Sequence, residues 1–303
     1  MSAIITVKSG RRVSLLTDRA IYDGQGVIIA ETTKSYSVRS WTGVVASRGN
    51  LLGSFMAENI AEQFGSFDEF LALSAPLFED TFADQVHLML NQPLIEIHAA
   101  AWSESRDEPV AYFLDSREEK GPAFEWREFE GSFSCSPFPT NAGWHWLHRQ
   151  GLEIDTDFDA EDFDAERHGL PWMEAMRRVR TEAAFLESTP YAVGCGVDVA
   201  EVTREGVSIR SLRTWPDQIG ALIEPGPLPA ARLSDVAPSF VSAKDQAIWW
   251  AMKRDGALDP VTLLPMRRVP LSPGPLPQTA PPSAGLNRQQ RRALERQQRQ
   301  GVA

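Results

Sequence analysis

The 303-residue chain is poor in cysteine and lacks long apolar runs. Its two cysteines, Cys135 and Cys195, are too few for a disulfide scaffold and fit a reducing compartment. No stretch approaches the roughly 18 apolar residues of a membrane span. The first residues also lack the basic flank and the apolar core of a signal peptide. We therefore expect a cytoplasmic or particle-associated protein without a membrane partner.

Basic residues are in the minority, since 30 Lys and Arg stand against 41 Asp and Glu, for a net charge of −11. Most of the surface should therefore repel nucleic acid and membrane phosphate. The hydrophobic share of 43% is that of an ordinary globular protein, and the length suits one large domain or two smaller ones.

Metal ligands with a convincing spacing are also lacking. His145 and His148 lie three residues apart between tryptophans, but a zinc site would need further ligands that the sequence does not place. The acidic run that begins at Asp155 has the carboxylate spacing of a calcium loop, yet Ala160 replaces the glycine that the sharp turn requires. We expect a solvated acidic loop there, with no metal and no cofactor.

The first forty residues hold the strongest structural pattern. Short apolar runs at residues 2–8 and 12–17 flank a Gly-containing turn and predict a hairpin at the very N-terminus. A third run covers residues 26–30, and residues 35–39 and 42–46 predict another strand pair. First residues are usually loose unless something holds them, so a strand that starts at residue 2 is unusual.

Ser2 is a candidate nucleophile because it follows the initiator methionine, which is normally trimmed before so small a residue. Trimming would leave a hydroxyl and a free α-amine on the same residue. The α-amine titrates near neutrality, at about 7.7–8.0. An adjacent amine can activate a terminal hydroxyl nucleophile, so Ser2 would carry its own base.

Asp18 follows the second predicted strand and Lys34 opens a later one. With Ser2, this pattern resembles the N-terminal nucleophile (Ntn) hydrolase superfamily, and most of all its proteasome β-subunit branch. The resemblance implies an α+β fold, a four-layer αββα sandwich, here with a Pro-rich C-terminal extension. It also implies that Ser2 attacks the carbonyl of a peptide or small amide substrate, that Lys34 supports proton movement, and that Asp18 orients Lys34.

The same resemblance implies accessory groups. A backbone N–H at Ser47 or Arg48 would form the oxyanion hole, although the glycine of the family is displaced in this turn. Ser134 or Ser136 would help to orient the terminal amine. An Asp that the family places before its last strand pair has no clear counterpart in this chain. Proteasome-like relatives form rings, so a homo-oligomer is an expectation as well.

Each of the three central residues also has a structural interpretation. Serine is the commonest residue after an initiator methionine, so Ser2 need not be a nucleophile. Asp18 can cap a turn, and Lys34 can be an ordinary charge at a strand edge. The catalytic and the structural interpretations both stay open at this point.

Further elements follow along the chain. Ser66 with Glu69 predicts a capped helix start, and Pro76 should bend or break the helix that follows. Apolar periodicity and turn residues predict helices at 50–64, 67–85 and 170–186, and strands at 93–102, 110–115, 124–129, 190–202 and 207–212.

The composition divides the chain into four parts. Residues 1–215 form the predicted Ntn-hydrolase-like domain, and residues 216–269 a docked extension with one short helix at 242–254. Residues 270–285 are a Pro-rich linker, and residues 286–303 a basic tail.

The tail suggests an alternative function. Residues 286–299 carry five Arg against one Glu, a formal charge of +4 on an otherwise acidic protein. Its sequence resembles the tails of phage and phage-like particle proteins. The alternative is a catalytically inactive assembly protein on the same fold, which binds a protein or nucleic-acid partner through Arg288, Arg291, Arg292, Arg296 and Arg299.

Overall fold

The structure of the protein is a computed structural model that describes residues 2–89, 94–118, 121–129, 131–152, 160–180 and 190–228. All of these residues belong to the first of two units, Met1–Val241. The predicted helix at 242–254, the Pro-rich linker, the basic tail and residues 153–159 of the acidic run lie outside the described residues.

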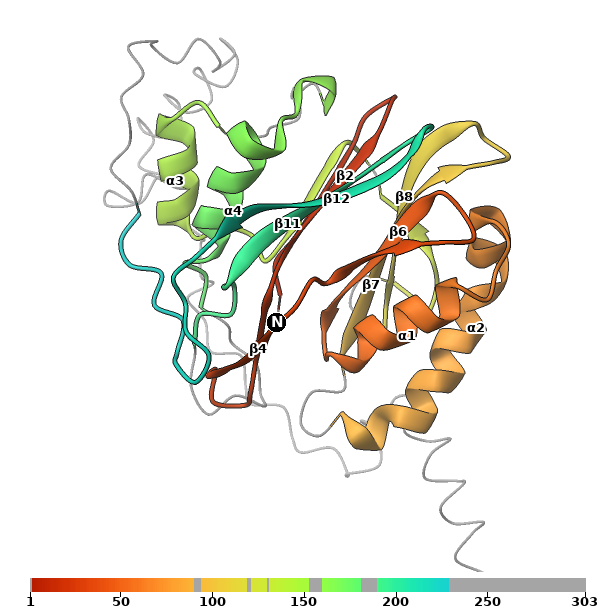
Figure 1. Ribbon diagram of the computed structural model, residues 1–303, viewed down its shortest axis with the longest axis horizontal. Helices are drawn as coiled ribbons and strands as arrows, with labels where there is room; N and C mark the ends of the chain where they lie inside the picture. Colours follow the sequence, from red (N-terminus) through yellow and green to blue (C-terminus); the bar gives the residue numbers. More distant parts are fainter. Residues whose placement is uncertain are drawn as a thin grey trace, which may run out of the picture. The chain divides into compact units, whose positions relative to one another are not determined.

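The N-terminal hairpin lies at the centre of the first sheet (Figure 1). This sheet has five antiparallel strands in the order β10-β1-β2-β11-β12. The strands are β1 (Ile4–Lys8), β2 (Val13–Asp18), β10 (Phe133–Ser136), β11 (Gly196–Thr203) and β12 (Gly206–Thr214). Because β1 is flanked by β2 and β10, the first strand is hydrogen-bonded on both sides within three residues of Met1.

The second sheet contains the other predicted strand pairs. Its five antiparallel strands run in the order β5-β6-β7-β8-β9. They are β5 (Ser35–Val38), β6 (Gly43–Gly49), β7 (Ile95–Ser103), β8 (Glu108–Asp115) and β9 (Arg127–Glu128). A two-stranded ribbon, β3 (Ala20–Tyr22) with β4 (Ile28–Glu31), continues from β2 and leads toward β5.

Four α-helices are described: α1 (Leu52–Ala61), α2 (Phe67–Gln85), α3 (Asn141–Arg149) and α4 (Leu170–Met176). Short 3-10 turns cover Val86–Leu88 and Ala160–Asp162, and a π-helical turn at Ala165–Gly169 leads into α4. No helix in the described part of the chain is long and apolar enough to cross a membrane.

The two sheets pack against each other through small and branched side chains. This inter-sheet core includes Ile4, Leu15, Val44, Ala100 and Ala200, all fully buried or nearly so. Because side chains alternate along a strand, the neighbours of these residues point to the outer faces of the two sheets. The alternation therefore gives the central strands of each sheet two buried faces, while the edge strand β12 is largely exposed.

The outer faces are covered by helices (Figure 1). An aromatic cluster with Phe67, Phe70 and Phe78 of α2 packs with α1 on the second sheet. Trp172 of α4 and Trp146 of α3 pack on the first sheet, against Ala3, Ile5, Val7 and Leu16 among others. The predicted mixed α+β class is confirmed, with helices and antiparallel sheets in one unit.

The start of α2 agrees with its sequence signal. The Ser66 side chain accepts a hydrogen bond from the Glu69 N–H at 3.1 Å, as an N-cap should. The Glu69 carboxylate accepts from the Gly65 N–H at 3.0 Å. Pro76 lies inside α2, which is assigned as one helix from Phe67 to Gln85, so the helix is not broken there.

Some predicted boundaries are wrong. The strand expected at 124–129 is reduced to Arg127–Glu128, because Phe124 has a positive φ of 56° that ends the extended backbone. The helix expected at 170–186 is described only as Leu170–Met176. The strand β10 and the helix α3 were not predicted.

Candidate functional site

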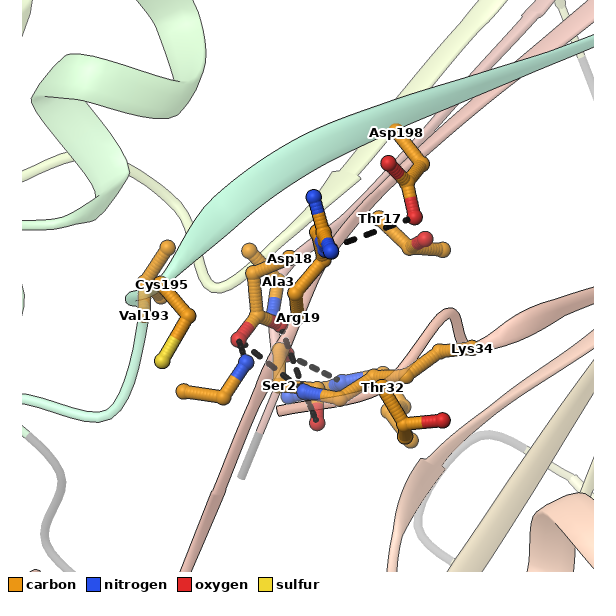
Figure 2. Close-up of polar contacts among 12 residues, drawn as sticks. Ser2, Ala3, Thr17, Asp18, Arg19, Thr32, Lys34, Val193, Cys195 and Asp198 are labelled. Atoms are coloured by element: carbon orange, nitrogen blue, oxygen red, sulfur yellow. Dashed lines mark hydrogen bonds and ion pairs between the residues drawn. The ribbon is translucent and has the colours of Figure 1, made fainter. Parts of the chain in front are cut away.

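Ser2, Asp18 and Lys34 meet at the N-terminal end of β1 (Figure 2). The Lys34 ammonium donates to Ser2 Oγ at 2.8 Å and to the two Asp18 carboxylate oxygens at 3.0 and 2.9 Å. All three residues are buried: Ser2 is 6% exposed, Lys34 4% and Asp18 not at all. The spacing pattern of the sequence therefore corresponds to one contact cluster.

Asp18 is held in place by backbone donors as well as by Lys34. It is the last residue of β2, and its Oδ1 accepts from the Ala3 N–H at 2.8 Å while its Oδ2 accepts from the Ala20 N–H at 3.2 Å. A buried carboxylate needs such partners to offset the loss of water. The Asp18 side chain thus fixes both the start of β1 and the Lys34 ammonium.

Burial lowers the pKa of Lys34 below its usual 10.5, while the neighbouring Asp18 acts in the opposite direction and limits the change. The contact between Lys34 and the Asp18 carboxylate favours the charged form of the amine beside Ser2 Oγ. A positive charge at this distance favours any negative charge that develops on the hydroxyl oxygen.

The pairing register decides which backbone N–H groups near Ser2 are open. The Trp102 N–H bonds to the Thr42 carbonyl, and the Asn50 N–H to the Leu94 carbonyl, so these residues form hydrogen-bonded pairs between β6 and β7. Arg48 lies at an equivalent position, paired with Glu96 of β7. In an antiparallel ladder its N–H is therefore directed to β7 and away from Ser2.

Ser47 and Gly49 alternate with Arg48, so their N–H groups are directed to the other edge of β6. The partner on that edge, β5, begins at Ser35 opposite Ala46, so the same register places Lys34 opposite Ser47 and directs the Ser47 N–H to the Lys34 backbone. Gly49 lies beyond the end of β5. Ser47 and Gly49 both line the cavity that contains Ser2. The Ser47 side chain is turned to α1, where its hydroxyl lies 2.5 Å from that of Ser54.

The predicted oxyanion residues therefore have different positions. Ser47 has its N–H directed to the Lys34 backbone, whereas the displaced glycine, Gly49, directs its N–H to the same edge beyond the end of β5 and lines the cavity. Arg48 instead reaches Ser2 through its side chain, with Nε 3.1 Å from the Ser2 carbonyl oxygen.

Ser134 and Ser136, unlike Lys34 and Arg48, make no hydrogen bond to Ser2 in the described part of the chain. Both lie on the half-buried strand β10, opposite Thr6 and Ile4 of β1.

A cavity of about 510 Å³ opens beside the three residues. Ser2, Lys34 and Ser47 contribute its polar end. Most of the remaining wall is apolar, with contributions from the β3–β4 ribbon, from the start of α1 and from the segment after α2. Among the apolar wall residues are Ile21, Ile29, Leu51, Leu52, Leu88 and Met89.

Sequence reasoning missed a second polar cluster next to Asp18, around the positive-φ residue Cys195. The Asp217 carboxylate accepts from the Cys195 N–H at 2.7 Å and forms an ion pair with buried Arg177. This contact lies between segments 40 residues apart, and no local spacing in the sequence indicates it. Figure 2 shows Cys195 near Asp18, and burial raises the pKa of the Cys195 thiol to about 11, so it is no thiolate at neutral pH.

Among the described residues, no group of three or more His, Cys, Asp or Glu side chains could hold a metal ion. Residues 155–159 of the candidate calcium loop and the arginines of the tail, from Arg288 to Arg299, lie outside those residues. The second half of the loop is described, and its Glu166 pairs with Arg210 at 3.0 Å.

No protein-family model and no curated protein matches this chain. The interpretation of the site therefore depends on its own geometry.

Proposed function

We propose that the chain is an N-terminal serine amidohydrolase or peptidase of the Ntn-hydrolase type. The observation that carries the proposal is the single buried contact in which Lys34 bridges Ser2 Oγ and Asp18. A lysine that only balanced Asp18 would not need to be within 2.8 Å of a serine hydroxyl.

The layers of the fold support the same proposal. Two antiparallel sheets share one core, α1 and α2 cover the outer face of one sheet, and α3 and α4 that of the other. This order of layers is what the αββα sandwich of the superfamily would give. A fold alone does not imply an activity, so the proposal stands mainly on the site.

In the proposed reaction, removal of Met1 frees the Ser2 α-amine. Ser2 Oγ attacks the substrate carbonyl carbon, a C–O bond forms, and the hydroxyl proton passes to the α-amine. The tetrahedral intermediate collapses, the C–N bond breaks, and the leaving amine takes that proton. Water then attacks the ester and gives its proton to the α-amine, and Ser2 Oγ recovers it as the carboxylic acid leaves.

Lys34 and the edge of β6 stabilise the charges of this reaction. The Lys34 ammonium lowers the cost of negative charge on Ser2 Oγ and disfavours protonation of the nearby α-amine by like-charge repulsion. The N–H of Gly49 is the candidate for the oxyanion hole, because it is directed to the edge of β6 beyond the end of β5, beside the cavity.

The cavity indicates the substrate class. A substrate whose carbonyl carbon meets Ser2 Oγ would place its adjacent side chain against the apolar wall. Burial of apolar surface contributes about 25 cal/mol per Å², so an apolar side chain next to the cleaved amide should be preferred over a charged one. The substrate is a peptide or a small amide.

The test is the intact mass of untagged protein before and after treatment with a β-lactone. We expect loss of Met1 and one adduct with the full mass of the reagent, mapped to Ser2. Ser2→Ala should fold normally and take up no reagent. Ser74→Ala removes another buried serine hydroxyl, distant from the site in α2, and should be labelled like the wild type. Retained Met1, or equal labelling of Ser2→Ala, would overturn the proposal.

The charge of the tail favours a second candidate function, capture of an anionic partner by residues 286–299. The test compares the full chain with a variant that ends at residue 285 in a pull-down. Equal capture by both would count against this function. Ser2→Ala removes the proposed nucleophile and leaves the tail unchanged. If this variant captured as much partner as the wild type, partner binding by the tail would be independent of the hydrolase site.

A further inference from the structure

The side chain of Arg48 has no part in the reaction described above, although it is buried beside the nucleophile. Arg48 is 8% exposed and lies on the inter-sheet face of β6, in line with Val44 and Ala46. A charge is costly to bury unless its donors are matched. Its contacts therefore indicate what it does there.

Glu96 of β7 anchors the guanidinium. The Glu96 Oε2 atom lies 3.2 Å from one terminal nitrogen of Arg48, and its Oε1 lies 2.8 Å from His98 Nε2. Arg117 approaches the same Oε2 atom at 3.5 Å and pairs with Asp115 at the end of β8. Glu96 is 2% exposed, so these contacts form in a part of the protein from which water is almost excluded.

The anchored guanidinium holds the backbone of the nucleophile. Arg48 Nε donates to the Ser2 carbonyl at 3.1 Å, while the N–H at the other side of the same peptide group, that of Ala3, donates to Asp18. Arg48 belongs to the second sheet and Asp18 to the first. The Ser2–Ala3 peptide group is therefore hydrogen-bonded to a side chain from each of the two sheets.

These hydrogen bonds matter because Ser2 lies outside the strand pairing of β1. The pairing of β1 with both neighbours begins at Ile4, so no strand register fixes the backbone of Ser2. Misplacement of a reacting group by about 1 Å can cost about 10²-fold in rate. A hydrogen bond to the Ser2 carbonyl fixes the one residue whose position decides whether Oγ meets Lys34.

We propose that Arg48, anchored by Glu96, is a positioning residue that holds Ser2 by its carbonyl and so aligns the hydroxyl for attack. This inference rests on the proposed hydrolase function. Arg48 would not touch the substrate, and its effect would be exerted through Ser2.

The experiment measures β-lactone labelling of Ser2 over a range of reagent concentrations, to separate the maximal rate kinact from the half-saturating concentration KI. We expect Arg48→Gln to lower kinact by about 10- to 100-fold with KI changed less than about threefold. Arg48→Lys keeps a positively charged donor but replaces the planar guanidinium with an ammonium on a shorter side chain. This variant should have a kinact between that of Arg48→Gln and that of the wild type.

Arg117→Gln is the matched control. It removes a cation from the same Glu96 carboxylate but leaves the hydrogen bond between Arg48 and Ser2, so kinact should stay within about twofold of the wild type. If Arg48→Gln fails to fold, the paired variant Arg48→Gln with Glu96→Gln removes the charges together and gives the same readout.

Wild-type kinact in Arg48→Gln, or in the paired variant, would overturn the positioning role while the proposed hydrolase function stood. Equal losses in Arg48→Gln and Arg117→Gln would also overturn it, because they would show a general effect of the charge cluster. Absence of labelling at Ser2 in the wild type would overturn the proposed function and this inference with it.

Discussion

At the scale of single residues, the site depends on one buried ion pair. Lys34 and Asp18 are both almost completely buried, so each relies on the other in place of water. Removal of one partner from such a pair leaves an uncompensated charge and costs about 3–5 kcal/mol. The two residues should therefore matter for stability as well as for reactivity.

The first prediction concerns Asp18→Asn, which keeps the shape of the side chain and removes its charge. We expect the free energy of unfolding in urea to fall by about 3–5 kcal/mol, and labelling of Ser2 to be lost. The double variant Asp18→Asn with Lys34→Met removes both charges and should recover part of the stability but none of the labelling. Unchanged stability in Asp18→Asn would show that the pair is not buried as described.

The second prediction concerns the thiols. Burial raises the pKa of Cys195 to about 11 and that of Cys135 to about 12, from an ordinary value of 9.0. Only the thiolate reacts, so at pH 8 both should be alkylated by iodoacetamide on the order of 100-fold or more slower in the folded protein than in urea. Rapid alkylation of the folded protein would contradict this and would make a thiol a competing target for the β-lactone.

The sequence alone led to Ser2, Asp18 and Lys34 but not to the buried contacts of the Arg48 side chain with Ser2 and Glu96. The reason is that alternation assigns residues to two faces without saying which face meets solvent. Charged residues on an alternating strand usually indicate a solvated face. In this protein Arg48 and Glu96 lie between the two sheets, and this burial is visible only once the sheets are packed on each other.

At the scale of elements, the end of β6 requires a glycine. Gly49 has a φ of +100°, and a Cβ there would lie 2.3 Å from the Leu94 carbonyl oxygen. This backbone is where β6 leaves its register and turns toward α1 beside the cavity. A side chain would therefore disturb both the fold and the proposed oxyanion edge.

The third prediction is that Gly49→Ala lowers the free energy of unfolding by more than about 1–2 kcal/mol, the cost of a left-handed backbone alone for an L-residue. Gly220→Ala is the matched control, since Gly220 has a φ of +89° with nothing within 4 Å of the added Cβ. The difference between the two variants in urea unfolding isolates the contact with Leu94. If both variants lost the same free energy of unfolding, the backbone would have moved away from the Leu94 carbonyl without a further energetic penalty.

Elements that are determined by neighbouring residues in the sequence were easier to predict than elements that form only through pairing with a distant strand. Ser66 and Glu69 mark the start of α2 correctly, because a helix cap is decided within four residues. The strand β10 is only four residues long and half-buried, and it is a strand because β1 offers it a free edge. That pairing joins residues about 130 positions apart, which local periodicity does not record.

At the scale of the whole described unit, an ion pair between β1 and β9 is among the contacts that join the two sheets. Lys8 of β1 pairs with Glu128 of β9 at 3.1 Å, and Arg106 holds the same carboxylate through two of its nitrogens. The hydrogen bond from Arg106 is the main reason that the pKa of Glu128 falls from 4.5 to about 2. The Glu128 side chain is 33% exposed, so solvent weakens this contribution to stability.

The fourth prediction is the pH dependence that follows from this pKa. Because the carboxylate is harder to protonate in the folded state, Glu128 stabilises the fold fully above pH 4.5. As the pH falls from 4.5 to about 2, the unfolded chain takes up the proton first, and the contribution is lost. The free energy of unfolding should therefore differ between wild type and Glu128→Gln at pH 6, and this difference should shrink toward zero near pH 2.

Comparison with a variant removes the effect of the other carboxylates, which titrate equally in both proteins. Glu125→Gln, an exposed carboxylate on the same segment, serves as the control and should follow the wild type at every pH. A difference between wild type and Glu128→Gln that stayed constant from pH 6 to pH 2 would mean that the carboxylate acts through packing rather than charge. The link between β1 and β9 would then not depend on the ion pair, and Lys8→Met should leave stability unchanged as well.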